Sequence, residues 1–379
     1  MDFSLSEEHI AVRNAAREFA QHTLLPGVIE RDDKQIFPTQ QVKMMGELGF
    51  MGMMVSPNYS GGGMDTVSYV IALEEIAKVD ASSAVIMSVN NSLVCWGIEV
   101  YGTEEQKASY LKPLAAGEKI GAFCLSEPEA GSDATAITTR AEDKGDHYLL
   151  NGTKNWITNG NSASVYVVIA QCDPKAGYKG ISAFIVDKET SGIEVGPKEN
   201  KLGIRSSDTH SVIFSDVKVP KKNVLGESGT GFKFAMQVLN GGRIGIAAQA
   251  LGIAMGAYEL SLRYAKERKS FGSVIAKHQA IQFKLADMES SIEAARLLCF
   301  KAAYLKDNDH EYAKASAIAK LIASQTAMDV TVEAVQIHGG YGYVKEFHVE
   351  RMMRDAKITQ IYEGTSEIQK MVIARDILK

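Results

Sequence analysis

The spacing of apolar residues divides the chain into a helical part, a strand-rich part and a second helical part. From Ser4 to about Gly117, stretches such as TVSYVIALEEIAKV keep their apolar residues on one helical face. Between about Ile120 and Gly231 the pattern changes to short β-branched runs broken by turn residues. Long amphipathic segments then return and predict helices at 232–269, 278–306, 312–338 and 367–379. We therefore expect an α+β fold: an N-terminal α-helical domain (1–119), a middle β domain built as a small antiparallel barrel or sandwich (120–230), and a C-terminal four-helix-bundle domain (231–379).

Local sequence signals predict where several helices and strands begin or end. Ser6 stands before two acids and predicts a helix start, and Thr103 with Gln106 forms a capping-box pattern. The Asn151-Gly152 pair is typical of a tight hairpin turn between two strands. Gly252 and Gly256, four residues apart in an apolar run, favour close packing of one helix on another.

Composition excludes some classes of partner. The 379 residues carry a net charge of −5 with both signs interspersed, so no basic surface for nucleic acid is expected. The four cysteines lie far apart and form no CxxC pair, which indicates reduced thiols and neither a disulfide framework nor a metal site.

The first residues have no apolar core of a signal peptide and no transit-peptide composition, so we expect a bacterial-type cytoplasmic protein. The apolar run at 244–258 is too short to span a bilayer, so we expect a buried helix and no membrane insertion.

Several well-known catalytic motifs are absent from the sequence. It contains no GxGxxG, GxxxxGK[ST], HExxH or GxSxG. A nicotinamide enzyme, a P-loop NTPase, a zinc protease and a serine hydrolase are therefore disfavoured.

Six polar or glycine-rich stretches are more specific than packing requires. They are FCLSEPEAGSD (123–133), NWITN (155–159), LNGGR (239–243), ERKSFG (267–272), QIHGGYGY (336–343) and IYEGTSEIQ (361–369). Taken together and in this order, they resemble the acyl-CoA dehydrogenase family over essentially the whole chain. The stretches at 80–94 and 201–207 look most like the short-chain, butyryl-CoA type.

The resemblance implies an enzyme that removes a proton from the α carbon of an acyl-CoA thioester and a hydride from the β carbon, giving a trans-2-enoyl-CoA. It implies FAD as cofactor, an electron-transferring flavoprotein as electron acceptor, and Glu363 as the base. An ordinary Glu has a pKa of about 4.3, so the base needs desolvation to raise its pKa toward neutrality. We expect Tyr362, flavin and substrate to supply that desolvation.

The resemblance also implies the cofactor contacts, which fall into three sets. Residues of the β domain would line the flavin, with hydroxyls at Ser126 and Thr158: Phe123, Leu125, Ser126, Ser132, Trp156, Ile157 and Thr158. Residues near the ends of the long helices would hold the adenine and pyrophosphate side of FAD in a neighbouring subunit: Arg268, Phe271, Gln279, Gln336, Gly339 and Gly340. The start of the last helix would meet phosphate through Thr365, Ser366 and Glu367. The sharing of FAD implies a homotetramer, a dimer of dimers.

For the acyl-CoA substrate, the family's positions match Ser132, Asn240, Arg243 and Gly364. Mitochondrial short-chain members carry an Asp where this chain has Asn240, so one charge is missing from that contact. No metal ligand is expected.

Each candidate also has a simpler structural interpretation. Glu363 could be a solvated acid before a helix that Ser366 and Gln369 cap. Trp156 could be a core residue and Ser126 part of a turn. Arg243 could be a buried ion-pair partner, while Arg268 could be an exposed helix-end cation and Gly339-Gly340 a helix stop.

Two other functions remain open at this point. An acyl-CoA oxidase on the same fold would pass its electrons to oxygen, although such enzymes tend to carry a further C-terminal domain. A scaffold that binds acyl-CoA or flavin without catalysis is the alternative from another class, and the intact Glu363, Arg243 and Thr158 disfavour it.

Overall fold

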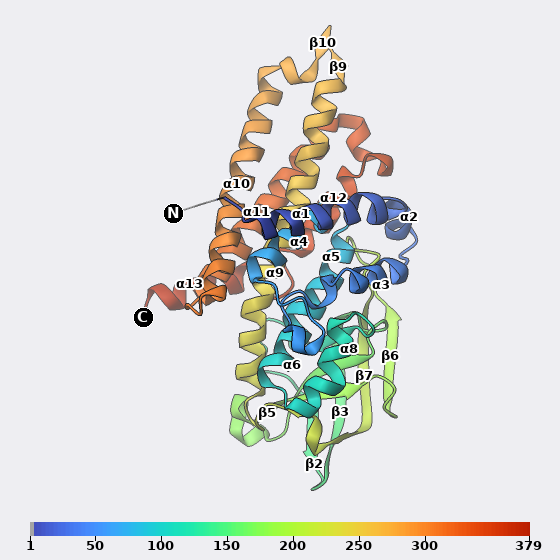
Figure 1. The fold of residues 1–379 in the computed structure, drawn as a ribbon, viewed down its shortest axis with the longest axis vertical. Helices are drawn as coiled ribbons and strands as arrows, with labels where there is room; N and C mark the ends of the chain where they lie inside the picture. Colours follow the sequence, from blue (N-terminus) through green and yellow to red (C-terminus); the bar gives the residue numbers. More distant parts are fainter. Residues whose placement is uncertain (1–3) are drawn as a thin grey trace.

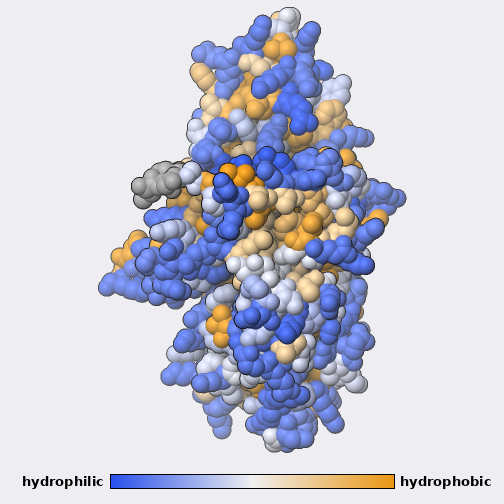
Figure 2. All heavy atoms as spheres, in the orientation of Figure 1, coloured by the Kyte–Doolittle hydropathy of each residue, from blue (hydrophilic) through white to orange (hydrophobic). Residues whose placement is uncertain are grey.

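The computed structural model describes residues 4–379 and shows helices at one end and strands at the other (Figure 1). The surface over the strands is mostly hydrophilic, whereas apolar atoms gather across the helical middle of the same face (Figure 2). The predicted α+β class with helical, strand-rich and helical parts is confirmed. The expected domain limits stay a proposal; helix gives way to strand between Ala115 and Gly121, and strand to helix between Leu225 and Gly231.

The N-terminal part consists of short helices. The predicted start at Ser6 is confirmed, since its side chain accepts a hydrogen bond from the His9 N–H, and Thr103 and Gln106 form the predicted capping box. The helices are α1 (Glu7–Phe19), α2 (Val28–Asp33), α3 (Thr39–Glu47), α4 (Thr66–Ala77), α5 (Ala81–Ser88), α6 (Trp96–Tyr101), α7 (Glu104–Gln106) and α8 (Lys112–Ala115), with a π-helical segment at Val89–Cys95 between α5 and α6.

The middle part is an eight-stranded sheet with the order β6-β7-β3-β2-β4-β5-β8, and β1 is added beside β4. The sheet is mixed rather than purely antiparallel, because β4 pairs in parallel with both β1 and β2. The strands are β1 (Gly121–Cys124), β2 (Arg140–Asp143), β3 (His147–Thr158), β4 (Val165–Gln171), β5 (Ile181–Asp187), β6 (Ile193–Lys198), β7 (Thr209–Pro220) and β8 (Val224–Leu225).

The predicted hairpin turn at Asn151-Gly152 is wrong. Strand β3 runs straight through this pair, with a register shift against β7 between Leu150 and Gly152. Gly152 has a φ of 148° and lies against Thr139, where a Cβ would clash with the backbone. The glycine therefore permits a bulge and a close approach rather than a reversal of the chain.

Three long helices dominate the C-terminal part: α9 (Gly231–Glu267), α10 (Gln279–Asp307) and α11 (Ala313–His338). They agree with the predicted segments, and the last one is confirmed as α13 (Ser366–Ile377). The prediction missed α12 (Val349–Ile358). A two-stranded ribbon of β9 (Lys269–Ser270) and β10 (Ser273–Val274) joins α9 to α10.

The two helical parts share one hydrophobic core, which also takes in side chains from β1, β4, β5 and β8. A second core lies within the sheet region. The predicted close packing at two glycines of α9 is confirmed: Gly252 lies against the backbone of Glu74, and Gly256 against that of Lys78. Two helical stretches of the described chain, Ala81–Tyr101 and Gly231–Glu267, are long and apolar enough to cross a bilayer, but 94% and 83% of their apolar windows are buried. Burial against the rest of the molecule accounts for their apolar composition.

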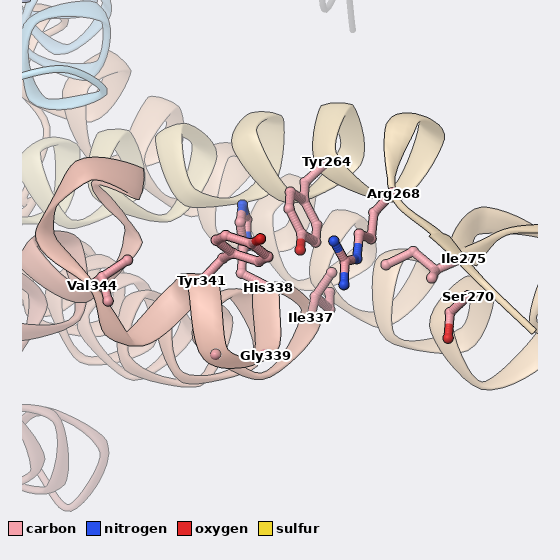
Figure 3. A pocket seen from close by; sticks show the side chains of 10 residues that line it. Tyr264, Arg268, Ser270, Ile275, Ile337, His338, Gly339, Tyr341 and Val344 are labelled. Atoms are coloured by element: carbon pink, nitrogen blue, oxygen red, sulfur yellow. The ribbon is translucent and has the colours of Figure 1, made fainter.

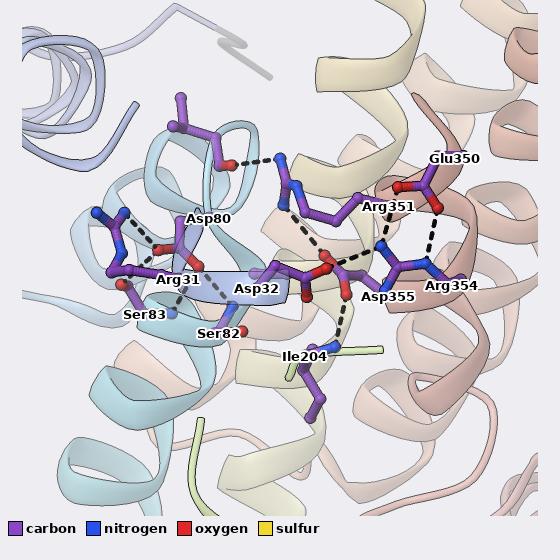
Figure 4. A network of polar contacts seen from close by, with 12 residues as sticks. Arg31, Asp32, Asp80, Ser82, Ser83, Ile204, Glu350, Arg351, Arg354 and Asp355 are labelled. Atoms are coloured by element: carbon purple, nitrogen blue, oxygen red, sulfur yellow. Dashed lines mark hydrogen bonds and ion pairs between the residues drawn. The ribbon is translucent and has the colours of Figure 1, made fainter. Parts of the chain in front are cut away.

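A polar network ties α12 to the N-terminal helices and to the loop before β7 (Figure 4). The carboxylate of Asp355 accepts hydrogen bonds from the Ile204 N–H at 2.5 Å and from Arg351 at 3.1 Å. Arg354 bonds Asp32 of α2 at 2.8 Å. These contacts fix α12, which leads directly into the turn that carries Glu363.

Candidate active site

Glu363 lies in a turn between α12 and α13 that has a left-handed backbone. Its φ is +50° and that of Gly364 is +92°, so two consecutive residues adopt a conformation that is costly for a side chain bearing a Cβ. Thr365, and not Ser366, caps α13, since its hydroxyl accepts from the Ile368 N–H. The predicted cap by Ser366 and Gln369 is wrong because the helix begins one residue earlier, at Ser366 itself. The Gln369 amide instead donates to the Gly364 carbonyl at 2.8 Å.

The carboxylate of Glu363 points into the protein. Its Oε2 is shielded from solvent and has no hydrogen-bond partner in residues 4–379. It lies directly against Gly242 of α9, where any Cβ would overlap it. Burial raises the pKa of Glu363 to about 7, while the positive charges of Lys320 and Arg243 oppose that rise. The interpretation of Glu363 as a solvated acid is therefore wrong.

Tyr362 anchors the other side of this turn in the core. Its hydroxyl bonds the side chain of Gln249, a fully buried residue of α9, and the amide of Gln249 donates to the Ala81 carbonyl at 2.7 Å. The bond to Gln249 fixes the aromatic ring next to Glu363, as expected if Tyr362 contributes to the desolvation of the base.

Asn240 and Arg243 lie one turn apart on α9 and are bonded to each other. The Arg243 guanidinium donates to Asn240 Oδ1 at 2.6 Å, and its Nε has no partner among the described residues. Arg243 is buried, yet it forms no ion pair within residues 4–379, so its interpretation as a structural ion-pair partner is wrong.

The segments FCLSE and NWITN, which are about 30 residues apart, are joined by backbone and side-chain bonds. The Asn155 N–H donates to the Ser126 carbonyl at 2.8 Å. Behind this contact, the fully buried ammonium of Lys154 donates to the Leu125 carbonyl at 3.0 Å and pairs with Glu127 at 2.7 Å. A buried ion pair thus fixes the backbone from which Leu125 and Ser126 project.

The side chains at this edge of the sheet form an open wall. Trp156 is 60% exposed with a φ of +60°, so it is not a core residue. The hydroxyls of Ser126 and Thr158 are partly exposed and have no hydrogen-bond partner in the described chain. Phe123, Leu125 and Ile157 are buried beneath the wall, and Phe123 faces Phe234 of α9 with ring centroids 6.5 Å apart. Ser132 is exposed in the loop that follows.

The adenine-side residues gather at the far end of the long helices. There, a pocket of about 560 Å³ lies between the end of α9 and the end of α11 (Figure 3). The Arg268 guanidinium stacks over the Tyr341 ring at 5.2 Å, and Gly339 and Gly340 leave open space where side chains would stand. Arg268 also ends α9 and Gly339 ends α11, so the helix-end interpretations hold as well. Gln279 and Gln336 are exposed nearby, and Phe271 is 96% exposed at the tip of the ribbon.

The two predicted FAD regions are far apart within one chain. Phe234, which meets Phe123, and Arg268 are on the same helix, and 34 residues of α-helix span roughly 50 Å. One FAD molecule cannot contact both regions of a single chain. The flavin-side residues therefore form one group in the structure, and the adenine-side residues form a second group at a distance from it.

The sequence reasoning missed three residues next to Glu363. Lys320 of α11 is 1% exposed and donates to the Gly364 carbonyl at 2.5 Å. Leu93 and Glu363 both face Gly242. Gln249 holds Tyr362. The available signals were a lysine within the apolar run AIAKLIA and a glutamine within IGIAAQALGI, since an isolated polar residue on a buried helix needs a partner.

Comparison with known proteins agrees with this arrangement. Three family models match successive parts of the chain: the acyl-CoA dehydrogenase N-terminal domain at residues 6–118, the middle domain at 122–217 and the C-terminal domain at 229–378. The short-chain specific acyl-CoA dehydrogenase of Clostridium acetobutylicum is 52% identical over 100% of both chains.

Two solved structures match the whole chain with the same TM-score. Butyryl-CoA dehydrogenase from Megasphaera elsdenii is 48% identical with a TM-score of 0.99, covering 100% of both chains. A chain in a structure of the electron transferring flavoprotein of Acidaminococcus fermentans is 50% identical, again with a TM-score of 0.99 and 100% of both chains covered.

The three-part fold, the buried and unpaired carboxylate of Glu363 and the similarity to short-chain acyl-CoA dehydrogenases define an oxidoreductase that acts on acyl-CoA thioesters. The chain belongs to the acyl-CoA dehydrogenase family, and FAD is its cofactor. The residues present fit that cofactor, because the exposed Trp156 offers a planar surface and the hydroxyls of Ser126 and Thr158 are free to bond it.

Proposed function

We propose that this chain converts short-chain acyl-CoA thioesters to trans-2-enoyl-CoA, with Glu363 as the base that removes the α proton. The observation that carries this proposal is the unpaired, solvent-shielded Oε2 of Glu363 in a strained turn. A carboxylate without a partner in a packed site is available to accept a proton, and a pKa of about 7 suits a base that works near neutral pH.

The backbone of the same turn supplies a second function. The Glu363 N–H has no acceptor within residues 4–379. A free N–H beside the base supports a role as hydrogen-bond donor to the thioester oxygen, which would stabilise the negative charge that develops there when the α proton leaves.

FAD, when bound, supplies the acceptor for the β hydride. We propose that Phe123, Leu125, Ser126, Trp156, Ile157 and Thr158 hold its ring, and that Thr365, Ser366 and Glu367 at the start of α13 meet its phosphates, where helix N–H groups favour an anion. Asn240, Arg243, Ser132 and Gly364 remain our proposed substrate contacts.

The proposed adenine-side residues support a shared site. Because Arg268, Phe271, Gln279, Gln336, Gly339 and Gly340 lie far from the flavin wall of their own chain, we propose that they complete the FAD site of a second copy. This supports the homotetramer implied by the family resemblance.

The short-chain preference and the electron acceptor follow from similarity. The C. acetobutylicum relative is named short-chain specific, and the A. fermentans structure is named for an electron transferring flavoprotein. We propose butyryl-CoA as the preferred class of substrate and an electron-transferring flavoprotein as acceptor, in the cytoplasm. Turnover of butyryl-CoA measured against octanoyl-CoA and palmitoyl-CoA tests the chain length.

The deciding experiment is Glu363→Gln, which keeps the shape of the side chain and removes the base. We expect the variant to retain FAD and to bind butyryl-CoA, but to lose flavin reduction by at least about 10³-fold. Reduction near the wild-type rate would exclude Glu363 as the base, and a colourless protein that takes up no FAD would favour the scaffold. Rapid reoxidation of the substrate-reduced wild type in air would favour the oxidase.

A further inference from the structure

We propose that Lys320 is a positioning residue for Glu363: its buried ammonium holds the turn through the Gly364 carbonyl and supplies the positive charge that favours the ionised base. This inference rests on the proposed role of Glu363. It assigns a function to a lysine of α11 that the reaction itself does not require.

The first argument is the geometry of the bond. Lys320 is 1% exposed, and its only hydrogen bond to the described chain is the one to the Gly364 carbonyl, at 2.5 Å. The same carbonyl accepts from the buried amide of Gln369 at 2.8 Å. Two donors from two helices therefore converge on the carbonyl directly after the base. Together they hold Glu363 and Gly364 in a left-handed conformation that would otherwise relax.

The second argument is the cost of burying this charge. A lysine ammonium removed from water is unfavourable unless it is paired, and Lys320 has no carboxylate within 4 Å in residues 4–379. An apolar residue would fill this position in α11 at lower cost. The negative charge that offsets this cost is that of Glu363, which interacts with Lys320 at longer range.

The third argument is the balance of charge around the base. Lys320 on α11 and Arg243 on α9 are the two cations that act on Glu363. The neutral titratable groups that feel its charge are Tyr69 on α4 and Tyr362 in the same turn. Arg243 itself faces Arg375 of α13 and Tyr312 at the start of α11. Burial lowers the pKa of Lys320 to about 7 and raises that of Glu363 to about 7, so the two groups titrate over the same pH range and each charge favours the other.

The test compares Lys320→Met, Lys320→Gln and a control, Lys201→Met, in the FAD-loaded protein. Lys201 is a partly buried lysine that also donates to a backbone carbonyl, that of Ser207 at 2.8 Å, and it is not one of the proposed site residues. Two quantities are measured against pH: the rate of flavin reduction by butyryl-CoA, and the protonated-carboxyl infrared band that is lost in Glu363→Gln.

For Lys320→Met, we expect both midpoints to move to higher pH by about one unit, with a roughly fivefold lower rate at pH 7 because the ionised fraction of Glu363 falls. Lys320→Gln keeps a donor for the Gly364 carbonyl without the charge, so its midpoints should move equally while its rate at high pH stays near wild type. Lys201→Met should leave both midpoints unchanged.

Unchanged midpoints in the Lys320 variants, with Glu363→Gln inactive, would overturn this inference and leave the base assignment intact. An active Glu363→Gln would overturn the base assignment itself. If Lys320→Met does not fold, the infrared midpoint of Lys320→Gln decides the matter, since a midpoint equal to that of the wild type contradicts the charge effect.

Discussion

The carboxylate of Glu363, in the turn between α12 and α13, is in direct contact with the backbone of Gly242 in the long helix α9. The same glycine faces the side chain of Leu93. The absence of a Cβ at this position therefore provides the space in which the base is placed.

Gly242→Ala should displace this carboxylate. The new methyl group overlaps Oε2 and also meets Leu93, so the base must shift by an appreciable fraction of an ångström. A misplaced catalytic group costs about 10²-fold in rate, and we expect a loss of that order in flavin reduction by butyryl-CoA. Gly241→Ala is the matched control, because the nearest atom to its Cβ would be Lys306 Nζ at 4.0 Å. Equal rates for the two variants would contradict the proposed placement of the base.

The rate of α-proton removal should depend on pH near neutrality. Burial raises the pKa of Glu363 to about 7, so below that pH the carboxyl is protonated and cannot act as a base. The rate of flavin reduction in single-turnover experiments should rise about tenfold per pH unit below the midpoint and level off above it. A rate that stays constant down to about pH 5 would indicate a base with the ordinary pKa of a glutamate.

The buried pair behind the proposed flavin wall should contribute strongly to stability. Glu127→Gln leaves the Lys154 ammonium without its counter-charge and should lower the free energy of unfolding by about 3–5 kcal/mol. The double variant Glu127→Gln with Lys154→Met should recover part of that loss, because no unpaired charge remains. Thermal melts measure both, and Lys222→Ala is the control, since its pair with Glu105 is exposed to solvent and should change the melting temperature little.

The same pair predicts an acid response. Lys154 holds the pKa of Glu127 at about 2, below its ordinary value of 4.5. A lowered pKa means that the contribution of this carboxylate to stability is present above about pH 4.5 and is lost as the pH falls through about 2. The difference in stability between wild type and Glu127→Gln should therefore shrink in acid; a constant difference would contradict the pairing.

Arg268→Gln should weaken FAD binding without touching the flavin wall of its own chain. The residue is roughly 50 Å along α9 from Phe234, so any effect on FAD must arise between copies. We expect a lower ratio of FAD to protein after gel filtration, whereas Arg263→Gln, an exposed arginine on the same helix, should retain the wild-type ratio. Full FAD retention in Arg268→Gln, or a monomer that holds FAD normally, would contradict the shared site.

The helices of this protein were predicted well because their signals are local. The periodic segments of the C-terminal part, the caps at Ser6 and Thr103 and the close packing at Gly252 and Gly256 all agree with the structure. The Asn151-Gly152 turn failed because a turn pair also suits a bulge, and the contact with Thr139 that makes the difference is not local. The cap of α13 lies one residue before the predicted one, since the Thr365 hydroxyl accepts from the Ile368 N–H and Gln369 bonds the Gly364 carbonyl.

By itself, the sequence determined the three-part architecture, the family and the identity of the candidate base, since periodicity and ordered motifs are properties of the chain. Only the tertiary structure decided the environment of that base: the contact with Gly242, the bond from Lys320 to the Gly364 carbonyl, and the anchoring of Tyr362 by Gln249. Those contacts join residues 44 to 121 positions apart along the chain. Desolvation and charge depend on such neighbours in space, so the pKa of Glu363 is a property of the fold.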